Sequence, residues 1–122
     1  MDLSIGSINI GVTDLERAVS FYRDVLRLEL LFSEPAHGYA RFRIGGVNFG
    51  VIAHDTSNPE VAAFTGRHTG LNLAVADLDA AVAELKARGA VFAMEPTRQL
   101  WGAYMATLSD PDANLFYLEA TS

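Results

Sequence analysis

The sequence predicts an α+β fold built from two tandem βαβββ modules in a single domain of 122 residues. Three observations support this prediction: an internal repeat, helix starts that follow short alternating strands, and turn-forming residues between the remaining strands. The modules are expected at about 5–53 and 69–120, with a linker of about 54–68. A chain of this length buries roughly two thirds of the surface that its unfolded form exposes, so it can fold without cross-links.

The internal repeat is clearest at the start of each module. When INIGVTDLERAV (8–19) is shifted by 63 positions onto LNLAVADLDAAV (71–82), six of the twelve positions are identical. The identical pairs are Asn9 with Asn72, Val12 with Val75, Asp14 with Asp77, Leu15 with Leu78, Ala18 with Ala81 and Val19 with Val82. The two halves of the chain are therefore interpreted as two copies of one unit.

Each copy begins with a strand in which apolar residues alternate with small or polar ones, and the apolar set is expected to face the core. The first strand carries Ile8, Ile10 and Val12, and its counterpart carries Leu71, Leu73 and Val75. Three more strands are predicted in each module, at residues 28–34, 39–45, 47–53, 90–96, 102–108 and 115–120. Gly, Pro, Asn and Asp residues mark the turns between them.

A helix follows the first strand of each copy. Thr13 or Asp14 can cap the first helix, and Asp77 holds the matching position before the second. Apolar residues at helical spacing indicate the buried faces, namely Leu15, Val19, Tyr22 and Leu26, then Leu78, Val82 and Leu85. The second helix is expected to end at Gly89, and the linker is expected to hold one helical turn near residues 59–64.

Composition limits the functions that the chain can have. Its apolar residues occur in short runs that do not reach a membrane-spanning length, and its first residues, MDLSIGSINIGV, lack the features of a secretory signal, so we expect no membrane partner and a cytoplasmic location. The chain has no cysteine, which excludes disulfides and thiolate chemistry. A formal net charge of -6 argues against nucleic acid as a partner. The same charge either favours a basic ligand or only aids solubility.

Two βαβββ units that begin with VTDLERAVSFYRDVLRLEL (12–30) and end with WGAYMATLSDPDANLFYLEA (101–120) resemble the vicinal oxygen chelate superfamily. That superfamily includes glyoxalase I, extradiol dioxygenases, fosfomycin-inactivating transferases, methylmalonyl-CoA epimerase and bleomycin resistance proteins. The resemblance implies curved mixed sheets that enclose a ligand cup. It also implies a homodimer, because a second chain usually completes the cup.

Metal-using members of this superfamily place His or Gln on each first strand and Glu on each last strand. The four matching positions here are Ser7, Gly70, Gly50 and Tyr117. None of these is a usual ligand, so the resemblance is closest to metal-free proteins of the bleomycin-resistance kind, and we expect no metal and no other cofactor.

Two displaced side chains are candidates to rescue such a site. His68 and Glu119 each lie two residues from a ligand position, on the same strand face. Two residues along a strand span roughly 6.6 to 6.8 Å, however, whereas a ligand atom must lie within about 2.0 to 2.6 Å of its ion. A shifted ligand therefore cannot hold the ion at the original centre.

Strand alternation also predicts which residues face the cup. The predicted ligand-binding residues are Ser7, Asn9, Asn48, Gly50, Gly70, Asn72, Trp101, Tyr117 and Glu119. Small residues leave space, amides offer hydrogen bonds and Tyr117 offers a flat face, which together suit a planar ligand. Each polar group also has a structural interpretation: the two repeat asparagines can satisfy neighbouring backbone groups, Trp101 can pack, and Glu119 can lie in water. The patterns of 39–45 and 102–108 do not fix which face lines the cup.

These observations favour a metal-free binding protein for an antibiotic or natural-product-like molecule, with no catalytic residue, because no acid–base pair emerges. The main alternative is an enzyme of the same fold, a lyase, isomerase or ring-cleaving dioxygenase that uses a relocated ion or only polar side chains. A cyclase or regulatory domain that uses the cup without a metal is a third interpretation.

Overall fold

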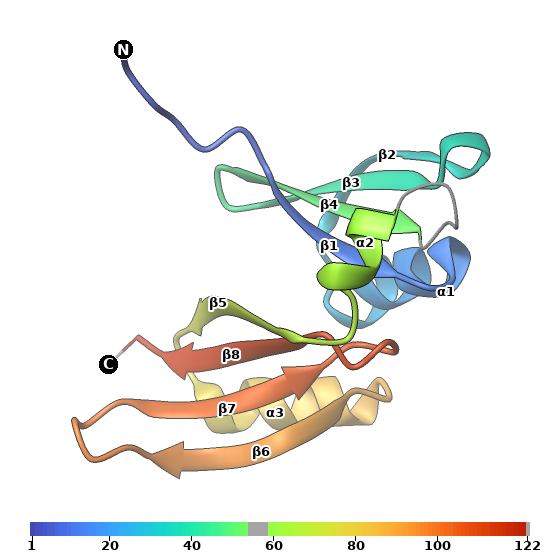
Figure 1. The fold of residues 1–122 in the computed structure, drawn as a ribbon. Coiled ribbons are helices and arrows are strands. Elements are labelled where there is room, and N and C mark those ends of the chain that lie inside the picture. Colours follow the sequence, from blue (N-terminus) through green and yellow to red (C-terminus); the bar gives the residue numbers. More distant parts are fainter. Residues whose placement is uncertain (54–58, 122) are drawn as a thin grey trace. The chain divides into compact units, whose positions relative to one another are not determined.

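The computed structural model describes residues 1–53 and 59–121. It divides into two compact units, Met1–Thr65 and Gly66–Ser122, and each unit has a four-stranded mixed sheet and its own long helical segment (Figure 1). The predicted α+β fold of two βαβββ modules is therefore confirmed.

The first unit contains the strands that form sheet 1, in the order β1-β4-β3-β2. Its elements are β1 (Ile8–Val12), α1 (Leu15–Ser20), a π-helical segment (Phe21–Val25), β2 (Glu29–Glu34), a 3-10 turn (Pro35–His37), β3 (Tyr39–Ile44), β4 (Val47–Ala53) and α2 (Pro59–Ala63). Strands β1 and β4 are parallel, and the other pairs are antiparallel.

The second unit repeats this topology in sheet 2, in the order β5-β8-β7-β6. Its elements are β5 (His68–Val75), α3 (Leu78–Ala87), β6 (Val91–Arg98), β7 (Tyr104–Ser109) and β8 (Leu115–Ala120). The parallel pair is β5 with β8, which corresponds to β1 with β4. The sequence repeat therefore coincides with a repeat of strand pairing.

Asp14 is the cap of α1, because its carboxylate accepts a 3.1 Å hydrogen bond from the backbone N–H of Arg17. The helix then widens at Phe21–Val25, where the N–H of Leu26 bonds to the carbonyl of Phe21, five residues back. Phe21, the first residue of this segment, is buried as well as Tyr22. The 3.6-residue pattern predicted Tyr22 and missed Phe21.

The second helix matches its prediction closely. The Asp77 carboxylate caps it through the N–H of Ala80 at 3.1 Å. All three stripe residues, Leu78, Val82 and Leu85, are buried. At the C-terminus of this helix Gly89 has φ +97°. The N–H of Gly89 donates to the carbonyl of Lys86, and the N–H of Ala90 donates to the carbonyl of Leu85, both at 2.9 Å. This pair of bonds is a Schellman motif, which requires the left-handed conformation that glycine supplies.

The core of each unit lies between its sheet and its helix. In the first unit Tyr22 packs against the rings of Phe42 and Phe49, at centroid distances of 5.9 and 5.2 Å. In the second unit the helix side of the sheet carries Phe116 and Leu108, which are paired across β7 and β8 and are almost completely buried. We call the opposite side of each sheet, away from α1 or α3, its far face.

Cross-strand register settles the facing of the strands that the sequence left open. Arg41 lies opposite Gly50, and Thr107 lies opposite Tyr117. Directly paired residues share a face, so Tyr39, Arg41 and Arg43 lie on the far face of sheet 1, and Met105 and Thr107 on that of sheet 2. Tyr104 lies on the helix side, where its hydroxyl donates a 2.6 Å hydrogen bond to Asp79 of α3.

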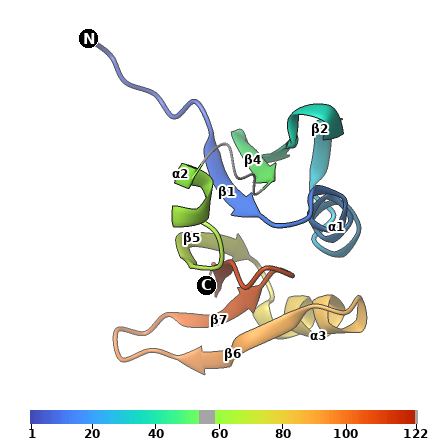
Figure 2. The ribbon, with the colours of Figure 1, turned by 45° about the vertical axis from the view of Figure 1, so that its right-hand side comes forward.

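Helix α2 falls within the predicted helical turn near 59–64, whereas the linker residues 54–58 lie outside the described residues. Figure 2 shows α2 beside β1, and the N–H of Gly11 bonds to the carbonyl of Phe64 at 3.1 Å. A Cβ at Gly11 would lie 2.0 Å from Thr65 Oγ1. Strand alternation places Gly11 on the same face as Asn9, and α2 and the residues after it cover this part of the far face.

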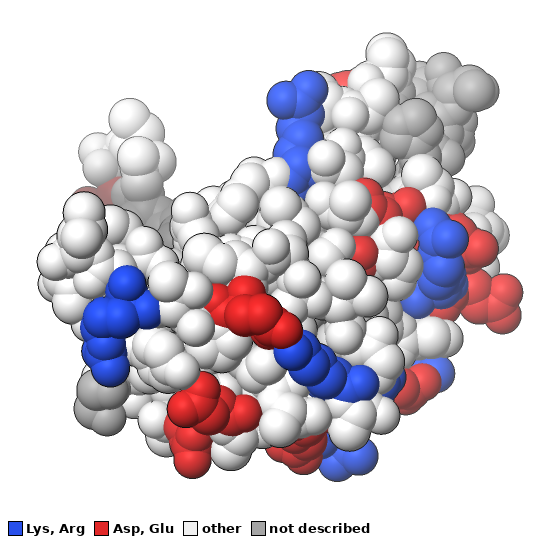
Figure 3. All heavy atoms as spheres, turned by 90° about the horizontal axis from the view of Figure 1, so that it is seen from below, with Lys and Arg blue, Asp and Glu red and all other residues white. Residues whose placement is uncertain are grey.

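Two properties of the described residues bear on possible partners. None of their helices combines the length and apolar character needed to cross a membrane. On the face drawn in Figure 3, basic and acidic side chains are interspersed and do not form a continuous basic surface.

Candidate functional site

The far face of sheet 2 carries a cavity of about 430 Å³. Its lining residues are Gly70, Asn72, Met94, Gln99, Trp101, Met105, Tyr117 and Glu119. The structure thus brings together the five candidate residues of the second module, and the cavity size is within the usual range for small-molecule sites.

Strand pairing places the polar residues of this cavity. Asn72 lies opposite Tyr117, and Glu119 is the next far-face residue of β8. The Asn72 side-chain amide donates a 2.6 Å hydrogen bond to Oε1 of Glu119. Asn72 therefore holds a carboxylate, not a neighbouring backbone group. The bond orients Glu119 and leaves its second oxygen able to accept a hydrogen bond from a ligand.

The Tyr117 ring packs against the His68 ring. The two ring centroids are 4.3 Å apart and the interplanar angle is 52°. Nδ1 of His68 accepts a 3.0 Å hydrogen bond from the N–H of Gly70, so the neutral ring carries its proton on Nε2. Gly70 has φ +76°, and no heavy atom lies within 4 Å of the position of a Cβ there. This glycine therefore provides both an unusual backbone conformation and open space.

Three cavity residues were missed by the sequence analysis: Met94, Gln99 and Met105. Strand β6 shifts register at Met94, between Phe92 and Thr97, so strict alternation does not describe it. Met105 lies on a strand with apolar residues on both faces, and only its pairing with Glu119 places it. Thioethers are polarisable and contact aromatic rings favourably, so both methionines add surface that can pack against an aromatic ligand.

Trp101 lies at the hairpin between β6 and β7. The hairpin is closed by a 2.7 Å bond from the N–H of Gln99 to the carbonyl of Ala103, and Gly102 has φ +101°. Trp101 is 75% exposed although it lines the cavity. It is therefore a rim residue and is not packed in a core.

The four candidate residues of the first module belong to the far face of sheet 1 and are not among the residues that line this cavity. Asn9 donates to Ser7 Oγ at 3.1 Å, and Asn48 donates to the carbonyl of Gly6 at 3.3 Å. A Cβ at Gly50 would lie 2.2 Å from Asn9 Oδ1 and 2.8 Å from the Tyr39 hydroxyl. The space expected above Gly50 is thus occupied by two polar side chains of the same unit.

The DPDAN turn has a structural role that positions the start of β8. The Asp110 carboxylate accepts bonds from the N–H groups of Asp112 and Asn114 at 2.8 and 2.9 Å and from the Asn114 side chain at 2.9 Å. Asn114, which is fully buried, accepts a 2.8 Å bond from the N–H of Gly66. These bonds support the strand that carries Tyr117 and Glu119.

The residues present do not fit a metal ion at the superfamily's usual positions. Ser7, Gly50, Gly70 and Tyr117 lie at those positions, and none of them has the His, Gln or Glu side chain that metal-using members place there. Over residues 1–53 and 59–121, His, Asp and Glu side chains do not gather in groups of three or more that could hold an ion. We therefore derive no chemistry through a metal.

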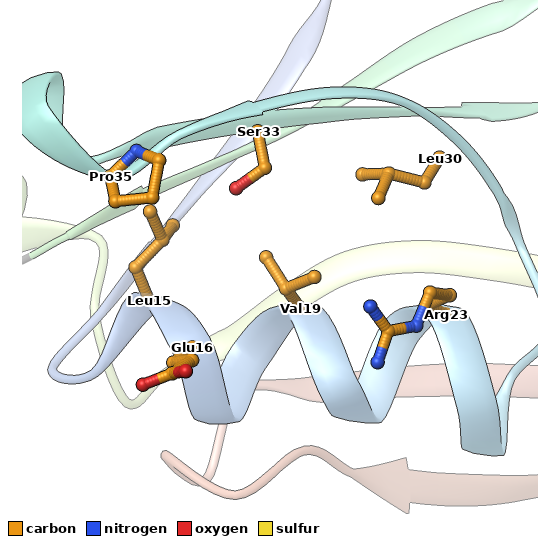
Figure 4. Close-up of a pocket in the computed structure, with 7 residues that line it drawn as sticks. All are labelled: Leu15, Glu16, Val19, Arg23, Leu30, Ser33 and Pro35. Atoms are coloured by element: carbon orange, nitrogen blue, oxygen red, sulfur yellow. The ribbon is translucent and has the colours of Figure 1, made fainter.

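A second cavity, of about 370 Å³, lies between α1 and β2 on the helix side of sheet 1. Figure 4 shows Leu15 and Val19 pointing from the helix toward Leu30 and Pro35. Arg23 at its edge bonds to both oxygens of Asp24, at 2.8 and 2.9 Å. This hydrogen-bonded pair raises the pKa of Arg23 and lowers the pKa of Asp24. The arginine is already neutralised, so this opening is a gap in apolar packing.

Comparisons with known proteins agree with this geometry. The family model for the Glyoxalase/Bleomycin resistance protein/Dioxygenase superfamily matches residues 4–118. A solved member of that superfamily from Sphaerobacter thermophilus DSM 20745 is 30% identical, with a TM-score of 0.80 and coverage of 98% of both chains. TnmS3, an antibiotic binding protein from Streptomyces sp. CB03234, is also 30% identical, with a TM-score of 0.75 and coverage of 100% of this chain and 99% of that one.

An enzyme is also among the similar structures. A lactoylglutathione lyase from Agrobacterium tumefaciens is 20% identical, with a TM-score of 0.77 and coverage of 99% of this chain and 96% of that one. Likeness at this identity extends to the fold alone. Taken with the matched family model and the two repeated βαβββ units, these findings show that the chain belongs to the glyoxalase/bleomycin resistance protein/dioxygenase superfamily.

Proposed function

We propose that this protein binds a planar aromatic small molecule, of the antibiotic or natural-product kind, on the far face of sheet 2, without making or breaking a bond. The observation that carries the proposal is the cavity of about 430 Å³, which combines aromatic and thioether walls with one oriented carboxylate. The likeness to an antibiotic binding protein at 30% identity over nearly both chains supports the same function.

Each part of the cavity has a role in this proposal. Tyr117 and Trp101 offer ring faces for stacking, and Met94 and Met105 offer polarisable surface around them. The Glu119 carboxylate accepts a hydrogen bond from the ligand or forms an ion pair with a cationic group on it. A preference for cations agrees with the chain's net charge of -6. The favoured ligand is therefore flat, largely apolar and basic at one edge.

Trp101, the single tryptophan of the chain, provides the assay. Titration with a panel of planar compounds should quench or shift its fluorescence with saturation, and the bound compound should be recovered chemically unchanged. If no compound changes the emission at tens of micromolar protein and calorimetry also shows no heat, the proposed function is wrong. Conversion of the compound to a product would instead favour an enzyme.

A lyase, isomerase or dioxygenase is the second candidate. One feature favours it: His68 and Glu119 both lie beside Tyr117 on the far face of sheet 2, where they could exchange protons with a bound molecule. Elemental analysis of the purified protein separates the two candidates most cheaply. Near-stoichiometric zinc, nickel, iron or manganese would contradict a metal-free site.

We also propose that the protein forms a two-fold homodimer. Sheet 1 ends in strands β1 and β2, and sheet 2 ends in β5 and β6. Edge strands expose backbone groups that favour pairing with another chain. A stable interface should bury on the order of 1,200 Å² or more. Light scattering that returns a particle of 13.2 kDa at micromolar concentration would contradict the dimer.

A further inference from the structure

Sheet 1 carries an arginine that its neighbours hold in place without neutralising it. Nε of Arg41 donates a 2.9 Å hydrogen bond to the Tyr39 hydroxyl. The guanidinium carbon lies 5.6 Å from the ring centroid of Tyr39 and 5.8 Å from that of Phe32. The side chain is half-buried, and within residues 1–53 and 59–121 it has no carboxylate at ion-pair distance.

The neighbours of Arg41 explain this arrangement. It lies opposite Phe32 on one side and Gly50 on the other. Gly50 has no side chain, so the space above it is taken by the Tyr39 hydroxyl and by Asn9 Oδ1. The Tyr39 oxygen accepts the bond from Arg41, which leaves the hydroxyl proton available to donate. Two kinds of donor, guanidinium and phenol, therefore meet beside a flat aromatic surface.

The other charged groups of this face do not cancel the arginine. Glu34, opposite Tyr39, lies 3.2 Å from Nδ1 of His37. Glu29 lies opposite Arg43 and not opposite Arg41. Arg41 is thus restrained by a hydrogen bond and two aromatic rings, and it takes no part in the ion pairs of the described part of the chain.

We propose that this cluster, Asn9, Phe32, Tyr39, Arg41 and Gly50, is a binding site for the anionic group of an aromatic molecule, such as an aryl carboxylate or sulfonate. The terminal N–H groups of a guanidinium match a planar oxyanion with two parallel hydrogen bonds. Because Tyr39 and Phe32 already restrict Arg41, binding costs less side-chain entropy than at a free arginine. All five residues of the cluster belong to the first unit.

The probe for this site is 2-naphthoate, and its neutral amide, 2-naphthamide, is the matched control ligand. In NMR titrations 2-naphthoate should shift the Arg41 Nε–Hε signal and the amide signals of β3 and β4. Its Kd should be about tenfold lower than that of 2-naphthamide, since only the anion gains charge-assisted hydrogen bonds. Acetate, which lacks the ring, should bind more weakly than 2-naphthoate by a similar factor.

Matched variants distinguish a built site from general attraction. Arg41→Gln and Arg43→Gln remove the same charge from the same strand face, but only Arg41 contacts the two rings. Arg41→Gln should raise the Kd about tenfold, and Arg43→Gln by less than about threefold. Tyr39→Phe keeps the ring and removes the hydroxyl, and it should raise the Kd about threefold by freeing Arg41.

Three outcomes would overturn this inference. The first is equal affinity for 2-naphthoate and its amide, and the second is an equal loss of affinity in the two arginine variants. The third is the absence of a saturable shift in the β3 and β4 amide signals below 10 mM ligand, a concentration that corresponds to a binding free energy of about -2.7 kcal/mol. In each case Arg41 would only cover aromatic surface. Tyr104→Phe, which changes only the helix side of sheet 2, should leave 2-naphthoate binding at Arg41 unchanged, and Trp101 fluorescence reports binding in the sheet 2 cavity separately. Failure here with retained cavity binding, or the reverse, therefore separates this inference from the proposed function.

Discussion

The side-chain amide of Asn72 and the carboxylate of Glu119 are joined by a 2.6 Å hydrogen bond across strands β5 and β8. The bond uses one carboxylate oxygen and leaves the other for a ligand. Because Glu119 is half-buried among Met105, Tyr117 and Asn72, its charge is screened less than that of a fully exposed carboxylate. Glu119 is thus the residue that should distinguish basic from neutral ligands.

We expect Glu119→Gln to weaken binding of the planar cation proflavine by about three- to tenfold, as loss of a partly solvated charge-assisted hydrogen bond implies. Binding of a neutral planar compound should change little. Glu95→Gln is the matched control, because Glu95 bonds to Lys86 outside the cavity. Equal losses in the two variants would show that only the overall charge of the protein matters. Fluorescence titration measures both.

Tyr117→Ala should weaken binding of a planar ligand by roughly 1 to 3 kcal/mol, about five- to 150-fold, through loss of stacking. The fold should persist, since Tyr117 is half-buried and lines a cavity. Tyr104→Phe is a suitable control, because Tyr104 lies on the helix side and contacts Asp79. Calorimetry gives the affinities. Unchanged affinity in Tyr117→Ala, with an intact fold by circular dichroism, would remove Tyr117 from the site.

Most of the fold could be predicted from the sequence because the same pattern, an alternating strand followed by a capped helix, occurs in both halves of the chain. The alternation of Ile8, Ile10 and Val12 recurs 63 residues later, and Asp14 and Asp77 cap both helices, as expected. The π-helical turn could not be predicted. The bond from Leu26 to Phe21 that defines it depends on how the helix packs on its sheet, which no local pattern records.

The candidate site was predictable only where strands alternate regularly. Gly70, Asn72, Tyr117 and Glu119 were placed on one face by the two-residue period, and the cavity contains them all. Met94 was missed because β6 shifts register around it. Arg41 was missed because residues 39–45 carry apolar side chains on both faces, so its position depends on the pairing with Gly50. Tertiary pairing, not local sequence, decides such cases.

Substitution of the glycine below the arginine cluster tests its geometry without removing a charge. A Cβ in Gly50→Ala would lie 2.2 Å from Asn9 Oδ1 and 2.8 Å from the Tyr39 hydroxyl, so both side chains must move. We expect the Arg41 Nε–Hε signal to shift and the Kd of 2-naphthoate to rise about three- to tenfold. Gly46→Ala is the control, since nothing lies within 4 Å of its Cβ position. An unchanged Arg41 signal would contradict the proposed convergence above Gly50.

The pKa of the Tyr104 phenol is raised, first because its hydroxyl donates a hydrogen bond to the Asp79 carboxylate and also through desolvation and the negative charge of Asp79. A raised folded-state pKa means that the stabilising contribution is fully present below the unfolded value of about 10. It is lost as pH rises through the folded-state pKa. NMR titration of ring-labelled tyrosine should show Tyr104 ionising above the normal range, and Asp79→Asn should bring its pKa down. An unchanged pKa in that variant would contradict this cause.

Asn114→Ala should destabilise the protein by about 2 to 3 kcal/mol, because it removes the side-chain oxygen that accepts from the N–H of Gly66 and the side-chain amide that donates to the Asp110 carboxylate. Asn48→Ala, which loses a single 3.3 Å bond to Gly6 near the surface, should cost less than about 1 kcal/mol. Urea unfolding measures both free energies. Similar values for the two variants would mean that the DPDAN turn does not stabilise the second unit in this way.

Tyr117→Glu restores the carboxylate that metal-using relatives carry at this position, and it tests whether one ligand is enough. Ser7, Gly50 and Gly70 would remain, and none of them can coordinate a divalent ion through an imidazole or carboxylate. The introduced carboxylate would lie beside His68 and Glu119. Both belong to strand positions two residues away from the usual ligands, roughly 6.6 to 6.8 Å along a strand. We therefore do not expect these three side chains to bring their ligand atoms within about 2.0 to 2.6 Å of one ion.

We therefore expect the folded Tyr117→Glu variant to show no zinc or nickel affinity at the micromolar level by calorimetry and no lyase activity. Tyr117→Gln, which has the same shape without the charge, is its control and separates coordination from general attraction of a cation. Micromolar affinity in Tyr117→Glu but not in Tyr117→Gln would mean that His68 and Glu119 can move onto a common centre. The second module would then be one substitution away from a metal site, and the assignment of a metal-free cavity would be wrong.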